Sequence, residues 1–158
     1  MSSLSRFFSP AMRYLTSLAL VILCLFATSC SSGHFEKQWL AAKAKPIAKN
    51  SIEGPWQGTW RSDGNGHTGA LRCIVGPAVD AAGTRAFQYR ATWAHLLSGG
   101  FTSKAVVQQH GNTATFKAKQ KLGKYGTFEC DAVVKGDSFR SIYKAAGDHG
   151  VLEMSRPH

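Results

Sequence analysis

The chain has 158 residues, enough for one domain with an N-terminal extension. Its 19 lysines and arginines outnumber 9 acidic residues, and the formal net charge of +10 favours anionic surfaces through long-range attraction. No nucleic-acid-binding motif accompanies this charge, so we expect a lipid surface or an acidic envelope polymer rather than nucleic acid, unless the charge serves only solubility.

The first 29 residues have the pattern of an export signal. Arg6 and Arg13 form a positive leading segment, and the run from Tyr14 to Ala27 is almost entirely apolar. About 14 apolar residues are too few to span a membrane as a helix, which needs roughly 20, but they suit the core of a signal peptide. Removal of residues 1–29 would take two arginines away, so the charge of +10 would become +8.

The sequence Ala27-Thr28-Ser29-Cys30 closes this segment and resembles the lipobox of bacterial lipoproteins. In that family the cysteine is acylated and becomes the mature N-terminus. The resemblance implies a lipid on Cys30 and a chain anchored in the cell envelope, facing the periplasm, with Ser31 favouring the outer membrane over the inner. Several acyl chains would hold the protein firmly, whereas one alone binds marginally. Leu is more usual at the position of Ala27, so cleavage by an ordinary signal peptidase remains an alternative.

Residues 30–54 have the composition of a tether, rich in lysine and alanine. Phe35, Trp39 and Leu40 are spaced for one amphipathic helical stretch that ends before Pro46. We therefore expect a partly helical tether that holds a domain of residues 55–158 away from the membrane.

The domain itself has a β pattern. Short runs of β-forming residues are separated by turn signals such as Gly136-Asp137, and no long helical pattern interrupts them. Such regular strands predict an all-β fold, an eight-stranded antiparallel up-and-down barrel. The expected strands cover residues 56–62, 68–76, 85–94, 101–110, 113–121, 126–135, 138–145 and 151–156.

Alternation along these strands predicts an aromatic interior and a charged exterior. The residues expected to face inward are Leu71, Cys73, Val75, Phe87, Tyr89, Ala91, Trp93, Phe101, Ser103, Ala105, Val107, Ala114, Phe116, Ala118, Phe128, Cys130, Ala132, Phe139, Ser141, Tyr143, Leu152 and Met154. Cys73 and Cys130 would lie on strands that are not neighbours, and a disulfide needs Cα atoms within about 7 Å. A disulfide across a flattened barrel and a pair of buried thiols are both open at this point.

Gly58-Thr59-Trp60 on the first expected strand, with Arg156 at the end of the last, resembles the pattern of calycins, which include lipocalins and avidins. In that family a Gly-x-Trp opens the barrel and an arginine packs across the indole ring. The resemblance implies structural roles for Gly58, Trp60 and Arg156, with a cation–π contact worth roughly 0.5–2 kcal/mol. The GPWxGxW start and DHGxxxM close also resemble small bacterial exported proteins, a likeness that implies no activity.

In such a barrel the loops after strands one, three, five and seven share one mouth, and they hold most of the chemically versatile side chains. The candidate ligand-binding residues are His67, His95, Tyr125, Asp148 and His149 at the mouth, with Phe87, Tyr89, Trp93 and Phe116 in the lumen. Imidazoles and a tyrosine around an aromatic interior suit a small apolar or amphipathic ligand.

The sequence patterns for metal binding and for hydrolysis are weaker than the pattern for ligand binding. No two histidines have a metal-ligand spacing, so we expect no metal and no other cofactor. Ser98 lies near candidate histidines in the expected mouth, but no nucleophile elbow surrounds it, so a hydrolase is the weakest reading and we expect no enzyme. The sequence therefore predicts a non-enzymatic binding module. The alternative is a packed barrel that docks on cell-wall polymer or a partner protein, in which His149 only ties the last loop to the first.

Overall fold

The computed structural model describes residues 33–93, 97–123 and 126–157. The expected signal segment and Cys30 lie outside these residues. The chain divides into two units, one ending at Leu40 and one beginning at Ala41. Residues 33–44 form a helix, on which Phe35 and Trp39 stack one turn apart with ring centroids 6.1 Å from each other. Within the described ranges, no helix combines the length and the apolar character that a membrane crossing requires.

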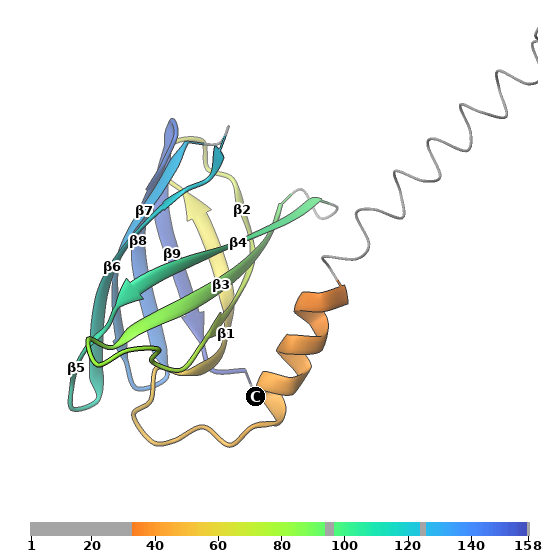
Figure 1. Cartoon of the computed structure of the whole chain (residues 1–158). Helices are drawn as coiled ribbons and strands as arrows, with labels where there is room; N and C mark the ends of the chain where they lie inside the picture. Colours follow the sequence, from red (N-terminus) through yellow and green to blue (C-terminus); the bar gives the residue numbers. More distant parts are fainter. Residues whose placement is uncertain (1–32, 94–96, 124–125, 158) are drawn as a thin grey trace, which may run out of the picture. The chain divides into compact units, whose positions relative to one another are not determined.

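The described part of the second unit forms nine strands in a single antiparallel sheet that curves into a nearly closed barrel (Figure 1). Each strand pairs with its neighbours in the order β4-β3-β2-β1-β9-β8-β7-β6-β5, so the meander is joined where β1 meets β9. The bounds are β1 (Gly54–Ser62), β2 (Thr68–Val75), β3 (Thr84–Trp93), β4 (Leu97–Val106), β5 (Gln108–His110), β6 (Thr113–Lys121), β7 (Thr127–Lys135), β8 (Ser138–Ala145) and β9 (Asp148–Ser155). The all-β antiparallel barrel is confirmed.

The strand count differs from the expected eight because one expected strand changes partner. The run expected over residues 101–110 pairs with β3 as β4 and, after Val107, with β6 as β5. At this switch the Val107 amide donates to the Gly83 carbonyl at 3.1 Å. The three residues of β5 are all exposed, so they have no burial pattern of their own that would mark them as a separate strand.

β4 also begins earlier than expected, at Leu97 rather than Phe101. Gly99 and Gly100 have the composition of a turn, yet they pair with Ala91 and Arg90 of β3. A Cβ atom at Gly100 would lie 2.7 Å from the Tyr89 carbonyl oxygen, closer than packed atoms allow. Glycine therefore permits a close backbone approach here instead of marking a loop.

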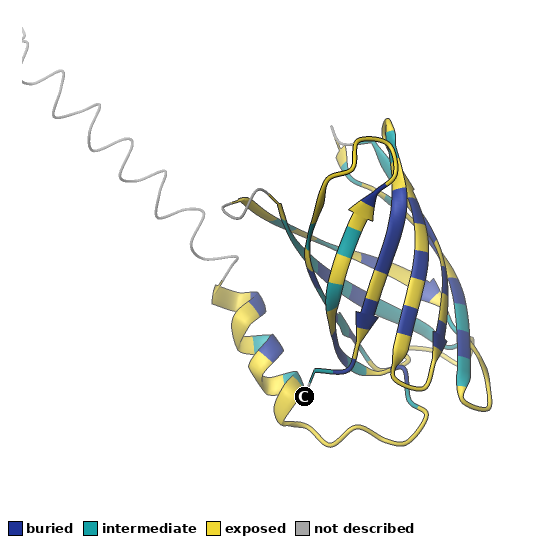
Figure 2. Cartoon of the chain, turned by 180° about the vertical axis from the view of Figure 1, so that it is seen from behind, coloured by how far each residue is buried: buried dark blue, intermediate teal, exposed yellow. Residues whose placement is uncertain are grey.

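The two-residue alternation places the core as predicted, with buried and exposed residues alternating along the strands (Figure 2). Phe87 stacks on Phe116 with ring centroids 4.2 Å apart, and Trp56 meets Phe139 at 5.6 Å. Trp93 is the exception to the predicted burial, because 39% of it is exposed. Phe101, Ala91 and Val107 are only partly buried against the core.

The two inward cysteines are both buried and free, so the structure has two thiols rather than a disulfide. Burial, followed by the neighbouring Cys130, raises the pKa of the Cys73 thiol well above its ordinary value. Both thiols therefore act as small apolar groups of the core.

Arg156 closes one end of the barrel on Trp56 rather than on Trp60, which corrects the pairing implied by the calycin resemblance. Its guanidinium carbon lies 3.7 Å from the Trp56 ring centroid, and its Nη1 donates to the Pro55 carbonyl at 3.1 Å. Nη2 donates to the Ser51 carbonyl. Burial lowers the pKa of Arg156 to about 10. Trp60 stands four residues further along β1, roughly 13 Å at the usual strand rise, and belongs to the opposite end.

Candidate functional site: a pocket at the barrel mouth

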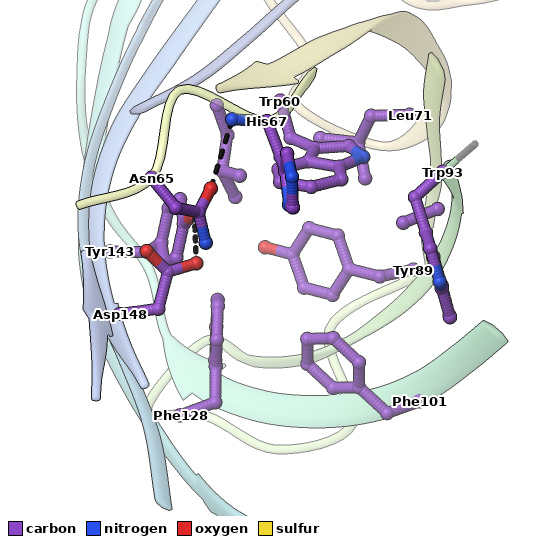
Figure 3. A pocket seen from close by; sticks show the side chains of 12 residues that line it. Trp60, Asn65, His67, Leu71, Tyr89, Trp93, Phe101, Phe128, Tyr143 and Asp148 are labelled. Carbon is purple, nitrogen blue, oxygen red and sulfur yellow. Dashed lines mark hydrogen bonds between the residues drawn. The ribbon is translucent and has the colours of Figure 1, made fainter. Parts of the chain in front are cut away.

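The end of the barrel opposite Arg156 holds a pocket of about 360 Å³ (Figure 3). The β1–β2 loop and the start of β9 meet there, because β1 and β9 are paired neighbours. The described residues that line it are Trp60, Asn65, His67, Leu71, Tyr89, Ala91, Trp93, Phe101, Phe128, Tyr143, Asp148 and Leu152.

The walls of the pocket are largely aromatic. Tyr89 stacks on Phe101 with centroids 5.1 Å apart, Phe101 lies 4.8 Å from Phe128, and Phe128 stacks on Tyr143 at 6.1 Å. These rings come from β3, β4, β7 and β8, so strands from both halves of the sheet order form the wall. Trp60 is held in place by its Nε1, which donates to the Thr92 carbonyl at 2.9 Å.

Asp148 is the centre of a hydrogen-bond network on the polar side of the pocket. Its Oδ1 accepts from the Ser62 hydroxyl at 2.5 Å and from the His149 amide at 2.8 Å, and its Oδ2 accepts from the Tyr143 hydroxyl at 3.0 Å. Burial acts to raise the pKa of Asp148, but the hydrogen bonds from Ser62 and Tyr143 lead the effects that hold it below its ordinary value of 3.8. The carboxylate is therefore charged at neutral pH.

The pKa of Tyr143 is shifted in the opposite direction to that of Asp148. Burial, and next the hydrogen bond to Asp148, raise the pKa of the Tyr143 hydroxyl far above its ordinary value. The hydroxyl keeps its proton at neutral pH and remains a donor to the carboxylate.

The β1–β2 loop is ordered by the same network. The fully buried Ser62 accepts from the amides of Gly64 at 3.2 Å and Asn65 at 3.1 Å, while Asn65 Oδ1 accepts from the His67 amide at 2.9 Å. The Asp63 amide donates to the His149 carbonyl at 2.8 Å, which ties this loop to β9. The polar rim is thus preformed.

Tyr89 contributes an unusual polar group to the pocket. The residue is only 2% exposed, yet its hydroxyl oxygen has no hydrogen-bond partner among the described residues. The Cys130 thiol is near enough to affect the pKa of Tyr89, which burial raises well above its ordinary value, but it forms no hydrogen bond of normal geometry. Figure 3 shows the hydroxyl pointing into the pocket, toward the side where Asp148 and Tyr143 lie.

The structure brings together some of the residues expected at the site. His67, Tyr89, Trp93 and Asp148 line the pocket. Phe87 and Phe116 stack deeper in the core, and His149 lines a separate groove on the outer face, while His95 and Tyr125 lie outside the described residues.

Sequence reasoning assigned no site role to Ser62 and treated Trp60 only as a structural residue. Ser62 could have been found from the signal Ser-Asp-Gly-Asn-Gly at a strand end, where a serine hydroxyl caps loop amides. Phe101, Phe128 and Tyr143 were expected to face inward, but their gathering at one end depends on strand register.

Ser98 and the metal-ligating side chain types are the candidates for catalysis or metal binding in the described residues. The Ser98 hydroxyl accepts a hydrogen bond from Arg90 Nη2 at 2.8 Å, and in the described part of the chain no hydrogen bond joins it to His67 or His149. Across the same ranges, no three His, Cys, Asp or Glu side chains are grouped as metal ligands.

Comparison with protein-family models, with curated proteins and with solved structures gives no match to the chain.

Proposed function

We propose that the barrel is a non-enzymatic binding module that takes a small apolar or amphipathic ligand at its mouth. One observation carries this proposal: a pocket of about 360 Å³ with aromatic and aliphatic walls and a few polar groups at one side. Small-molecule sites are typically concave, mostly apolar and roughly 300–1,000 Å³ in volume.

The arrangement of the rim supports the same conclusion. Ser62, Asp148 and the first loop are joined by hydrogen bonds before any ligand arrives. A preformed rim lowers the ordering cost of binding. The unpaired hydroxyl of Tyr89 is a polar group for which a ligand would supply the missing partner.

Binding of a neutral apolar probe, N-phenyl-1-naphthylamine, to the purified full chain tests the proposal through the rise in probe fluorescence. Ala91→Phe adds a ring inside the pocket and should weaken binding about tenfold or more, whereas Thr102→Phe adds the same ring on the exposed face of β4 and should not. Equal binding by both variants and the wild type, or no binding at all, contradicts the proposal.

We also propose that Cys30 anchors the chain by lipid in the cell envelope, on the periplasmic side. The support is the sequence pattern before Cys30, not the fold. Mass spectrometry of the purified chain should show an acylated N-terminal cysteine, and Cys30→Ser should release the protein from the membrane fraction. An unmodified N-terminus after Ser29 contradicts the anchor while leaving the pocket untouched.

A second candidate function is docking on an anionic envelope polymer, favoured by the formal net charge of +10. A groove of about 690 Å³ on the outer face of β6–β8 adds no net positive charge to it, because its three lysines are matched by Asp63, Glu129 and Asp131. Lys117, Lys119 and Lys144 line it, although Asp131 and Glu129 already pair with the first two at 2.8 and 2.6 Å. Binding to wall fragments that persists unchanged at high salt excludes charge as the docking force.

A further inference from the structure

We propose that the ligand of the mouth pocket is an organic cation with an apolar or aromatic body, whose positive end lies beside Asp148. This inference rests on the proposed binding function and adds the class of ligand. Three properties of the pocket carry it: the sign of its charge, its aromatic faces and an unsatisfied acceptor.

The charge of the pocket is opposite to that of the chain. The chain carries a formal charge of +10, yet among the described lining residues Asp148 is the one carboxylate and neither lysine nor arginine is present. His67 is the other ionisable side chain of the lining. An anionic ligand would lie beside a charged carboxylate, and the described lining has no lysine or arginine to offset the repulsion.

The carboxylate retains capacity for a ligand. Its Oδ1 already accepts two hydrogen bonds, from Ser62 and the His149 amide, but Oδ2 accepts only the one from Tyr143 among the described residues. Each carboxylate oxygen has two acceptor sites. The network therefore fixes the carboxylate at the pocket wall and leaves an acceptor site on Oδ2 for a ligand.

The aromatic residues offer ring faces to a cation. Trp60, Tyr89, Trp93, Phe101 and Phe128 surround the pocket in Figure 3. A cation within about 6 Å of such a ring is attracted by its electron-rich face, most strongly by tryptophan, and desolvation increases the attraction. Trp93 is more exposed than the other four rings, so it lies where a ligand would enter.

The hydroxyl of Tyr89 adds a polar contact that protein groups leave open. Its oxygen is buried, has no hydrogen-bond partner in the described structure and faces the Asp148 side of the pocket. A phenol oxygen accepts a hydrogen bond from an ammonium group and tolerates a positive charge. Rings and carboxylate together match an amphipathic amine or quaternary ammonium compound better than a fatty acid, and the Tyr89 hydroxyl offers a further hydrogen bond to the amine, which carries N–H donors.

Three probes of nearly equal size separate charge from shape. Benzyltrimethylammonium is the cation, neopentylbenzene is its uncharged carbon isostere, and phenylmethanesulfonate is the anion. Affinities for the purified full chain are measured by calorimetry and by quenching of tryptophan fluorescence. We expect the cation to bind about tenfold or more tightly than either of the other two.

Matched variants test whether Asp148 and Trp93 cause the preference for the cation. Asp148→Asn keeps the shape and should lower the affinity for the cation about tenfold while leaving that for neopentylbenzene within twofold. Glu153→Gln removes one carboxylate from the exposed face of β9 and should change neither. Trp93→Leu, at a partly exposed position, supplies a second test if Asp148→Asn unfolds. It should lower the affinity for the cation more than the affinity for neopentylbenzene.

The outcomes distinguish a failure of the cation inference from a failure of the proposed binding function. Neopentylbenzene or the sulfonate binding as tightly as the cation overturns the cation inference and leaves the binding pocket in place. A loss of cation affinity as large in Glu153→Gln as in Asp148→Asn also overturns it. No binding by any probe removes the binding function and the cation inference together.

Discussion

The hydroxyl of Ser62 donates to Asp148 Oδ1 at 2.5 Å across 86 residues of chain. Ser62 ends β1 and Asp148 begins β9, so this bond joins the first and last hairpins of the barrel where the first and last strands pair. The same carboxylate faces the pocket. The closure of the barrel and the polar rim of its mouth therefore depend on the same pair of side chains.

Ser62→Ala tests this joint role. The variant removes the donor to Asp148 and the acceptor for the amides of Gly64 and Asn65 in a fully buried position. Groups left unpaired by such a change typically cost about 1–3 kcal/mol. The free energy of unfolding in urea should fall by about that amount. Ser138→Ala, at the exposed first residue of β8, should change it by less than about 0.5 kcal/mol. Equal effects of the two variants would show that the network does not stabilise the fold.

The pH dependence of stability should include a contribution from Asp148. Its pKa in the folded state lies below the ordinary value of 3.8, which represents the unfolded chain. Folding therefore gains stability above about pH 4 and loses it as the pH falls through the folded pKa. Between pH 7 and pH 3 the free energy of unfolding should decrease more in the wild type than in Asp148→Asn, as measured by urea titrations at both values. Identical decreases would contradict a lowered pKa.

Residue pattern alone predicts the fold class and the inner face because side chains alternate with a period of two in every strand. Phe87, Tyr89 and Phe128 were placed inside on that basis and are buried. The partner switch at Val107 was not predictable, since β5 has only three residues, all of them exposed, and no alternation marks it as a separate strand. Burial of Cys73 and Cys130 was predicted, but whether they were bonded depended on a separation across the core that periodicity does not give.

The site was only partly predictable for a similar reason. His67 and Asp148 follow from loop position, because alternate loops of a meander share one end. The positions of Trp56 and Trp60 do not, since both occupy the same face of β1 and only the register with β9 shows which one meets Arg156. A motif match thus identified the right strand and the wrong tryptophan.

Arg156→Leu should destabilise the barrel through the end that Trp56 closes. The variant removes a cation–π contact and the two hydrogen bonds that Arg156 donates to the Pro55 and Ser51 carbonyls. The expected cost is about 2–4 kcal/mol in the free energy of unfolding, measured by urea titration. Arg140→Leu removes an exposed ion pair with Glu153 and should cost less than about 1 kcal/mol. Probe binding at the mouth should survive Arg156→Leu in the folded fraction, and its loss there would mean that the two ends are coupled.

The two tyrosines of the pocket should respond with opposite signs to loss of the hydroxyl. Tyr89→Phe removes a buried hydroxyl that has no hydrogen-bond partner in the described structure, so it should raise the free energy of unfolding by about 1 kcal/mol. Tyr143→Phe removes the donor to Asp148 at 3.0 Å and should lower it by about 0.5–1.5 kcal/mol. Because each change deletes one tyrosine hydroxyl from the same pocket, each variant is the control for the other in urea titrations. If Tyr89→Phe is also the variant that weakens binding of a primary ammonium probe, its hydroxyl is retained for the ligand at the expense of stability. A destabilised Tyr89→Phe would show instead that this hydroxyl already has a partner in the free protein.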